Sequence, residues 1–353
     1  MNKTKVFIVD DSAIVREILT DRLSRDPRIE VVGSAIDPYV ARDKLEKIEV
    51  DVITLDIEMP RMDGLTFLRQ LMKYFPKPVI IVSSLAKSSS QAAMEALELG
   101  AVDVVPKPGG PFSVEDVVDL LIDRILAAKE ADLGKLQAHS QRLQQSSPGN
   151  RIQKSYLAGL KTTNQLITVG ASTGGTIALE EIFRDWGMDF PPTLAVIHMP
   201  EKFTATFASR LNDLCEVTVK EAENGETLFP GTIYIAPGNY HMMLKTQGTE
   251  RFLRIATGPK VCNQRPAVDT MFNSVAEQVG RNCIGVLLTG MGKDGAQGLL
   301  KIKNAGGHTI AQDEASSIVW GMPKEAIDLG ASDCILPLGK ITEYIRKRLS
   351  NNL

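Results

Sequence analysis

The chain has 353 residues, of which 43% are hydrophobic and 24% are charged, a composition typical of globular proteins and a length sufficient for two domains. Its formal net charge of −3 argues against the basic surface that nucleic-acid-binding domains carry. No hydrophobic stretch approaches the roughly 20 residues that span a bilayer. The apolar run that starts at Lys5 leaves no room for a signal peptide, and the 4 cysteines lack the spacing of a metal site. We therefore expect a cytoplasmic protein that neither binds nucleic acid nor inserts into a membrane.

Residues 5 to about 125 alternate short apolar runs with amphipathic segments. This alternation predicts five parallel strands with helices on both faces of the sheet. The last helix is expected from Val114 to Ala128. Strands are expected at Lys5–Val9, Ile29–Ala35, Val52–Leu55, Val79–Ser83 and Val102–Val105.

Acids, a hydroxyl and an amine stand at the ends of four of these strands. Asp10 and Asp11 follow the first strand, and Asp56 follows the third. Ser83 ends the fourth, and Lys107 comes soon after the fifth. The carboxyl ends of parallel strands converge on one crevice, so the three carboxylates are expected to lie close together. They would repel one another without a cation, and Mg²⁺ is a cation that carboxylate oxygens bind. Asp56 is therefore predicted to accept a phosphoryl group whose oxygens Ser83 and Lys107 bind.

A single acid at a loop tip is more often a solvated charge, but the repetition at successive strand ends favours a site. With these residues, the N-terminal part of the chain resembles a response-regulator receiver domain, which implies a flavodoxin-like fold. The resemblance implies that Asp56 is the phosphoacceptor and that Asp10, Asp11 and the backbone carbonyl of Glu58 bind Mg²⁺. Val104 stands where many receivers carry an aromatic switch residue, so the route by which the signal leaves the domain stays open.

The composition changes to Gln, Ser, Lys and Ala over residues 127–162, and Ser146–Asn150 is typical of coil. We therefore predict a linker here, between a first domain at residues 1–126 and a second at 163–350.

The alternation of strands and helices resumes at about residue 165, with an expected antiparallel hairpin at His241–Ile255. The pattern predicts a doubly wound, mainly parallel α/β domain that carries this hairpin. Strands are expected at Leu166–Val169, Leu194–His198, Thr232–Ala236, Cys283–Leu288 and Thr309–Ala311, and helices at Thr176–Trp186, Thr204–Leu211, Val268–Val279 and Gly295–Ala305.

Three motifs of the second domain each follow an apolar strand. Gly170–Gly174 fits the G-x-S-x-G pattern, which places Ser172 at a tight turn before a helix. His198 ends the next strand, and Asp294 lies in a glycine-rich turn after Cys283–Leu288. A serine hydroxyl needs an adjacent base, and that base needs an orienting carboxylate. The three residues are therefore candidates for a catalytic triad, in an order that differs from that of α/β-hydrolases.

Other interpretations stay open at this point. A glycine-rich turn between a strand and a helix also binds phosphate, so the second domain could be a phosphate- or nucleotide-binding output without catalysis. A lone histidine is more often structural than catalytic. An output domain that binds DNA is disfavoured by the acidic net charge and by the size of the second domain.

Residues from about 165 to 348 resemble the catalytic domain of the chemotaxis protein-glutamate methylesterase family. The matching segments are the three motifs above together with Ala236–Gly238 and His241, Arg265–Pro266 with Val268–Asp269, Ala311–Glu314, and Gly321–Pro323. Lys293 and Ala267 stand where Asn and Ser would be expected.

The resemblance implies a phosphorylation-activated carboxylic ester hydrolase that acts on glutamate γ-methyl esters of chemoreceptors, with receptor glutamine deamidation as a second activity. Ser172 would be the nucleophile, His198 the base and Asp294 its orienting group, and the hydrolysis would need no cofactor. Backbone N–H groups near Thr173 and around Met291–Gly292 are candidates for binding the oxyanion. A chemotaxis histidine kinase would donate the phosphoryl group, and we expect a monomer. In this hypothesis the receiver restrains the catalytic domain until Asp56 is phosphorylated.

Overall fold

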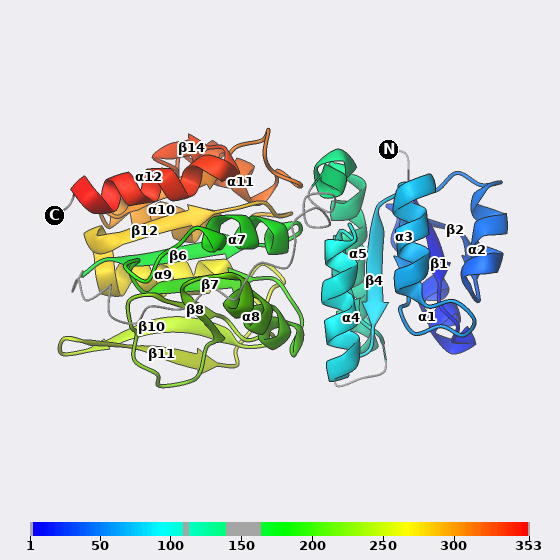
Figure 1. The fold of residues 1–353 in the computed structure, drawn as a ribbon, viewed down its shortest axis with the longest axis horizontal. Helices are drawn as coiled ribbons and strands as arrows, with labels where there is room; N and C mark the ends of the chain where they lie inside the picture. Colours follow the sequence, from blue (N-terminus) through cyan, green and yellow to red (C-terminus); the bar gives the residue numbers. More distant parts are fainter. Residues whose placement is uncertain (1–2, 109–112, 139–163, 352–353) are drawn as a thin grey trace. The chain divides into compact units, whose positions relative to one another are not determined.

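The computed structural model describes residues 3–108, 113–138 and 164–351 (Figure 1). The chain divides into two compact units, Met1–Ser147 and Pro148–Leu353. Each unit has its own β-sheet, and the two are described separately below.

The first unit contains a five-stranded parallel sheet in the order β2-β1-β3-β4-β5. Its strands are mostly buried, as expected for a parallel sheet covered by helices on both faces. The strands are β1 (Thr4–Val9), β2 (Ile29–Ala35), β3 (Val52–Leu55), β4 (Val79–Ser83) and β5 (Asp103–Pro106). The helices are α1 (Ala13–Leu23), α2 (Pro38–Leu45), α3 (Gly64–Tyr74), α4 (Lys87–Glu98) and α5 (Val114–Lys129). The predicted five-stranded α/β sheet is confirmed.

Part of the segment predicted as a linker packs on the first unit. Helix α5 continues to Lys129, and residues 133–138 form a further helical turn. Leu136 in this turn is buried, and the side-chain amide of Gln137 donates to the backbone oxygen of Met72 at 3.2 Å. The predicted coil at Ser146–Asn150 lies outside the described residues.

The second unit contains a seven-stranded parallel sheet in the order β14-β13-β12-β6-β7-β9-β8 and a separate antiparallel hairpin, β10-β11. This confirms the predicted mainly parallel domain with a hairpin. The strands are β6 (Leu166–Ala171), β7 (Thr193–Ile197), β8 (Thr218–Glu221), β9 (Thr232–Ile235), β10 (His241–Gln247), β11 (Glu250–Ala256), β12 (Cys283–Leu287), β13 (His308–Gln312) and β14 (Cys334–Leu336). The helices are α7 (Gly175–Arg184), α8 (Phe203–Leu214), α9 (Val268–Val279), the short 3₁₀ segment η1 (Gly280–Asn282), α10 (Ala296–Asn304), α11 (Met322–Asp328) and α12 (Leu338–Asn351).

The strand order reverses next to β6, and this reversal positions the site. From β6 the chain passes through α7 to β7 on one side, whereas β12 lies on the other side and leads through α10 to β13. Right-handed crossovers in opposite directions place α7 and α10 on opposite faces of the sheet. Helix α9 packs against α10, β6 and the hairpin strand β10, over an apolar core that includes Phe272 (Figure 1). In such sheets the point of reversal, at the carboxyl ends of the strands, is where ligands bind.

Strands β8 and β14 and helices α11 and α12 are not among the elements predicted from the sequence. Strands β8 and β14 are the two edges of the sheet and have four and three residues. Both are partly exposed, so they lack the continuous apolar run by which buried parallel strands are recognised.

Candidate active site and phosphoacceptor site

Ser172 directly follows β6 and precedes α7, as the G-x-S-x-G pattern predicts. Its N–H donates to the backbone oxygen of Thr289 at 3.0 Å, and its own carbonyl accepts from Gly175 N at 2.6 Å. Gly174 has φ +76°, a left-handed conformation that closes the turn and that glycine adopts without strain. Ser172 is only 4% exposed. The sequence therefore fixes this serine at the start of a helix, between two strand ends.

His198 lies at the end of β7, beside the strand that leads to Ser172. Its backbone N–H donates to the oxygen of Ala171, the residue before Ser172, at 3.2 Å. Its imidazole is buried, and Nε2 lies 2.7 Å from Oδ2 of Asp294. Two of the three predicted triad side chains are thus in direct contact, and strand pairing places the third next to the histidine.

Asp294 is held by the N-terminus of α9. Val268 N donates to its Oδ2 at 2.7 Å, and Asp269 N donates to its Oδ1 at 2.9 Å. The turn that carries Asp294 uses Gly292 at φ +87° and Gly295 at φ +92°. Both carboxylate oxygens are therefore fixed by backbone donors, and the orientation that meets His198 is preorganised.

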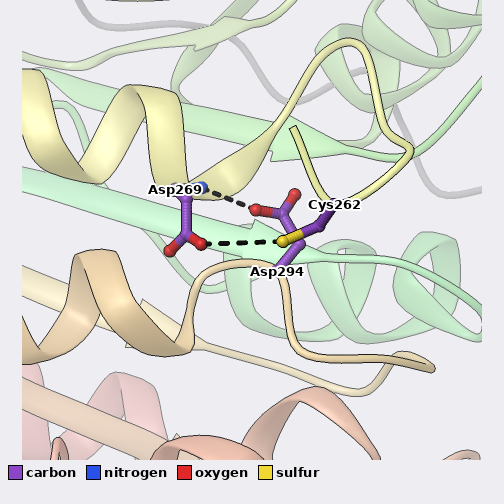
Figure 2. Close-up of side chains that lie close together, drawn as sticks. All are labelled: Cys262, Asp269 and Asp294. Atoms are coloured by element: carbon purple, nitrogen blue, oxygen red, sulfur yellow. Dashed lines mark hydrogen bonds between the residues drawn. The ribbon is translucent and has the colours of Figure 1, made fainter. Parts of the chain in front are cut away.

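A second carboxyl and a thiol lie beside Asp294, and the sequence analysis assigned neither to the site (Figure 2). Ligand atoms of Cys262, Asp269 and Asp294 all lie within 4.8 Å of one another, and Cys262 Sγ is 4.0 Å from Asp269 Oδ2. Burial raises the pKa of Asp269 to about 6, and the charge of Asp294 adds to this rise, whereas the N–H of Gly298 opposes it. Asp269 therefore changes charge close to the proposed triad in a pH range where the enzyme can be assayed.

Thr289 and Gly290, in the turn that follows β12, support the serine, a role that was not predicted from the sequence. The hydroxyl of Thr289 contacts the backbone oxygens of Thr173 and Val319 at 3.0 and 3.1 Å. A Cβ atom on Gly290 would lie 2.6 Å from the Cβ of Ser172. A small residue is therefore required beside the serine. The glycines in the Thr289–Gly295 motif were a signal for this close approach.

The predicted oxyanion donors lie in the same two turns. Thr173 is fully buried after Ser172, and Met291 and Gly292 follow Gly290.

The two positions that depart from the expected residue types also lie near the site. Lys293 is exposed beside Asp294. Ala267 precedes α9, and its N–H donates to Nδ1 of His241 at 3.3 Å.

The first unit brings together the predicted phosphoacceptor residues. Ligand atoms of Asp10, Asp11 and Asp56 lie within 4.8 Å of one another. Lys107 Nζ lies 2.7 Å from Asp56 Oδ2 and 3.2 Å from Asp10 Oδ2. Burial raises the pKa of Asp56 to about 6 in spite of Lys107, which acts in the opposite direction.

Ser83 and Glu58 complete this neighbourhood. Ser83 is fully buried at the end of β4, and its hydroxyl makes no hydrogen bond to another described residue. The N–H of Glu58 donates to Asp56 Oδ1 at 3.2 Å, and its carboxylate accepts from the hydroxyl of Ser89 at 2.5 Å. Val104 is buried in β5. The Ser83 hydroxyl is therefore able to donate a hydrogen bond to a phosphoryl oxygen on Asp56.

Two family models match the chain. Residues 167–345 match the CheB methylesterase model, and residues 6–119 match the response regulator receiver domain model. The crystal structure of the Thermotoga maritima CheB methylesterase catalytic domain is 43% identical and covers 52% of this chain and 97% of its own, with a TM-score of 0.51.

Curated relatives match over almost the full length. A protein-glutamate methylesterase/protein-glutamine glutaminase 2 of Syntrophus aciditrophicus is 52% identical over 98% of this chain and 99% of its own length. A protein-glutamate methylesterase/protein-glutamine glutaminase of Sulfurimonas denitrificans is 48% identical over 98% of both chains. The chain therefore belongs to the CheB methylesterase family, in which an N-terminal response-regulator receiver domain precedes the methylesterase domain.

Proposed function

We propose that this protein is a hydrolase that removes γ-methyl esters from glutamate side chains of chemoreceptors, under the control of phosphorylation at Asp56. The observation that carries the catalytic part is the contact between His198 Nε2 and Asp294 Oδ2, at the strand end next to Ser172. Full-length similarity to protein-glutamate methylesterases supports the substrate class. A phosphate- or nucleotide-binding output without catalysis would need no such histidine–carboxylate pair.

In the proposed reaction Ser172 is the nucleophile. Because Nε2 of His198 is engaged with Asp294, the ring nitrogen that takes the serine proton is Nδ1. The serine oxygen then attacks the ester carbonyl, and Asp294 stabilises the imidazolium that forms. The backbone donors on Asp294 keep it aligned throughout.

The negative charge on the tetrahedral intermediate needs donors that are already in position. We assign this role to backbone N–H groups near Thr173 and around Met291–Gly292, with the N-terminus of α7 adding a favourable field. The imidazolium returns its proton to the leaving methoxide, methanol departs, and water hydrolyses the glutamyl-enzyme. Attack on a glutamine amide by the same route would release ammonia, which is the glutaminase activity in the relatives' names. We propose no cofactor for either reaction.

The first unit, taken as a receiver domain at residues 1–126, would be phosphorylated at Asp56 with Mg²⁺. The residues present fit this ion, because three carboxylates with ligand atoms within 4.8 Å of one another form an all-oxygen donor set. Asp10, Asp11, Asp56 and the carbonyl of Glu58 would hold the ion, which would neutralise charge on the incoming phosphoryl group. Lys107 and the hydroxyl of Ser83 would bind the phosphoryl oxygens.

The methylesterase domain is proposed at residues 163–350, with a linker at 127–162 through which phosphorylation acts. A coupling free energy of about 1–3 kcal/mol between phosphorylation of Asp56 and the active state of the methylesterase domain would raise activity about 5- to 150-fold.

The kinase partner is proposed to be a chemotaxis histidine kinase. We propose that the chain works as a monomer in the cytoplasm. In the part of the chain that the structure describes, none of the helices has the length and apolar character of a membrane span.

Methanol release from a methylated chemoreceptor fragment tests the proposal. We expect release by the wild type, a rise when a small-molecule phosphodonor and Mg²⁺ are added, and no rise in Asp56→Asn. Ser172→Ala should lose about 10⁶-fold in kcat, down to the level that binding and oxyanion donors support. Near-normal release by purified Ser172→Ala would refute the triad. Release that is unchanged by the phosphodonor would refute only the proposed activation by phosphorylation of Asp56.

A further inference from the structure

A second cluster of reactive side chains lies at one edge of the sheet in the second unit. His308 opens β13, Asp333 and Cys334 stand at the start of the edge strand β14, and Tyr344 lies on α12. None of these residues has a role in the proposed hydrolysis, and the cluster does not depend on that proposal.

Hydrogen bonds link the side chains of Cys334, Tyr344 and His308, and Asp333 lies at ion-pair distance from the imidazole. The thiol of Cys334 donates to the hydroxyl of Tyr344 at 3.0 Å, and that hydroxyl lies 3.0 Å from Nε2 of His308. Cys334 Sγ itself is 3.8 Å from Nε2. On the far side of the ring, Nδ1 lies 3.2 Å from Oδ2 of Asp333. The negative charge of Asp333 favours a proton on Nδ1, which leaves Nε2 as the acceptor for the tyrosine hydroxyl.

Neighbouring groups hold the imidazole in this orientation. Asp333 Oδ2 accepts from the N–H of Thr309 at 3.0 Å and from its hydroxyl at 3.1 Å. Lys303 Nζ lies 3.3 Å from the other carboxylate oxygen. The ring of His308 stacks on that of Tyr344, with centroids 5.6 Å apart. A thiol, a base and a carboxylate that orients the base are the elements of an activated cysteine nucleophile.

Burial and two nearby positive charges favour a neutral imidazole at His308. Burial lowers its pKa, and the positive charges of Arg348 and Lys303 act in the same direction, whereas Asp333 opposes them. A neutral ring can accept a proton at Nε2. The imidazolium that results would face the carboxylate of Asp333.

We propose that Cys334 is a modification site, a thiol that His308 and Tyr344 activate for reaction with hydroperoxides. The thiol proton passes to the tyrosine oxygen while the tyrosine proton passes to Nε2. Sulfur attacks one peroxide oxygen, so that an S–O bond forms and the O–O bond breaks. The departing hydroxide or alkoxide takes the proton from the imidazolium. Sulfur is oxidised to a sulfenic acid by two electrons, and the peroxide is reduced.

Cys262 provides a control within the same molecule. It is exposed, whereas Cys334 is half-buried and Cys215 and Cys283 are buried. Partial burial of the sulfur and the charges of Asp294 and Asp269 raise the pKa of Cys262, and the charge of Lys293 opposes this rise. Accessibility alone therefore predicts that Cys262 reacts first, and the relay predicts that Cys334 does.

The experiment treats the full chain with dilute hydrogen peroxide at pH 7 in the presence of dimedone, which traps sulfenic acids. Mass spectrometry of peptides then gives the labelling rate at each cysteine. We expect Cys334 to react about tenfold faster than Cys262 or more. This ratio is smaller than the rate enhancement of about 10²- to 10⁴-fold that acid–base assistance can contribute. His308→Gln and Tyr344→Phe should each slow Cys334 by about tenfold and leave Cys262 unchanged. Tyr39→Phe, at an exposed tyrosine in the first unit, is the matched control and should change neither rate.

Faster labelling of Cys262 than of Cys334 in the wild type would overturn the proposal. So would an unchanged or increased rate at Cys334 in the two cluster variants. Circular dichroism checks the fold of each variant, and Tyr344→Phe, which retains the ring, decides the question if His308→Gln does not fold.

Discussion

The imidazole of His198 and the carboxylate of Asp294 lie 2.7 Å apart, although the two residues are 96 positions apart in the sequence. Adjacent strands β6, β7 and β12 bring the two residues and Ser172 to one sheet edge, where the strand order reverses. The same carboxylate accepts N–H groups of Val268 and Asp269, so α9 fixes the geometry before any substrate binds.

Replacing Asp294 by Asn should lower kcat about 10³- to 10⁴-fold, because the amide favours the wrong imidazole tautomer and leaves the imidazolium without a counter-charge. KM should change little, since the carboxylate contacts no substrate in the proposed reaction. Methanol release measured over a range of substrate concentrations gives both constants. Asp328→Asn, at an exposed position of α11, is the matched control. A loss of less than about tenfold would contradict the orienting role of Asp294.

Replacing Gly290 by Ala should misplace the nucleophile. The added methyl group would lie 2.6 Å from Ser172 Cβ and 2.4 Å from Met322 Sδ, so the serine turn must move. A displacement on this scale costs about 100-fold in kcat. Gly339→Ala is the control, because its nearest neighbour is at 3.5 Å. Equal activity of the two variants would show that the turn is not tightly packed.

Asp269→Asn should affect catalysis in a pH-dependent manner. With a pKa of about 6, Asp269 is ionised above that pH and then favours the imidazolium on His198 that develops in the transition state. Below pH 6 the wild-type side chain is neutral, as the amide is at all pH values. We expect a kcat about 5- to 30-fold lower at pH 8, which corresponds to about 1–2 kcal/mol, and convergence of the two enzymes at pH 5. Parallel pH–rate profiles would contradict this assignment.

Asp56→Asn should stabilise the first unit at neutral pH in the absence of Mg²⁺. The pKa of Asp56 is about 6 in the folded chain and 3.8 ordinarily, so between these values the folded state retains a proton that the unfolded state loses. The free energy of unfolding of the wild type therefore falls as pH rises through this window. The variant lacks this effect and should be more stable by about 1–3 kcal/mol at pH 7 and equal to the wild type near pH 4.

Urea unfolding separates the two units in this comparison. Trp186 and Trp320 both lie in the second unit, so tryptophan fluorescence follows that unit, whereas circular dichroism follows both. The shift should appear in circular dichroism alone. A variant less stable than the wild type at pH 7 would contradict the inference that the buried, ionised carboxylate of Asp56 destabilises the first unit.

The buried parallel strands could be predicted from the sequence because each is a continuous apolar run, as in Cys283–Leu287 of β12. The candidate catalytic and phosphoacceptor residues could be predicted from their positions directly after these runs, because the carboxyl ends of parallel strands meet at one edge of the sheet. Helix α9 could be bounded at Val268–Val279 from its apolar periodicity.

The residues that support the site could not be predicted in this way. Asp294 is held by the backbone N–H groups of Val268 and Asp269, which every residue type except proline supplies. The contact of Cys262 with Asp269 depends on a loop in which Cys262 has φ +50°. The edge strand β14 contributes only three partly exposed residues. In each case the information lies in tertiary packing and not in local pattern.

Covalent labelling can decide whether Ser172 is a nucleophile activated by His198. The full-length protein is treated with a fluorophosphonate, which reacts with activated serines, and the adduct is located by peptide mass spectrometry. We expect one adduct, on Ser172, that is lost in His198→Ala and in Ser172→Ala. An adduct on another serine, or labelling of Ser172 that persists at the same rate in His198→Ala, would contradict this expectation.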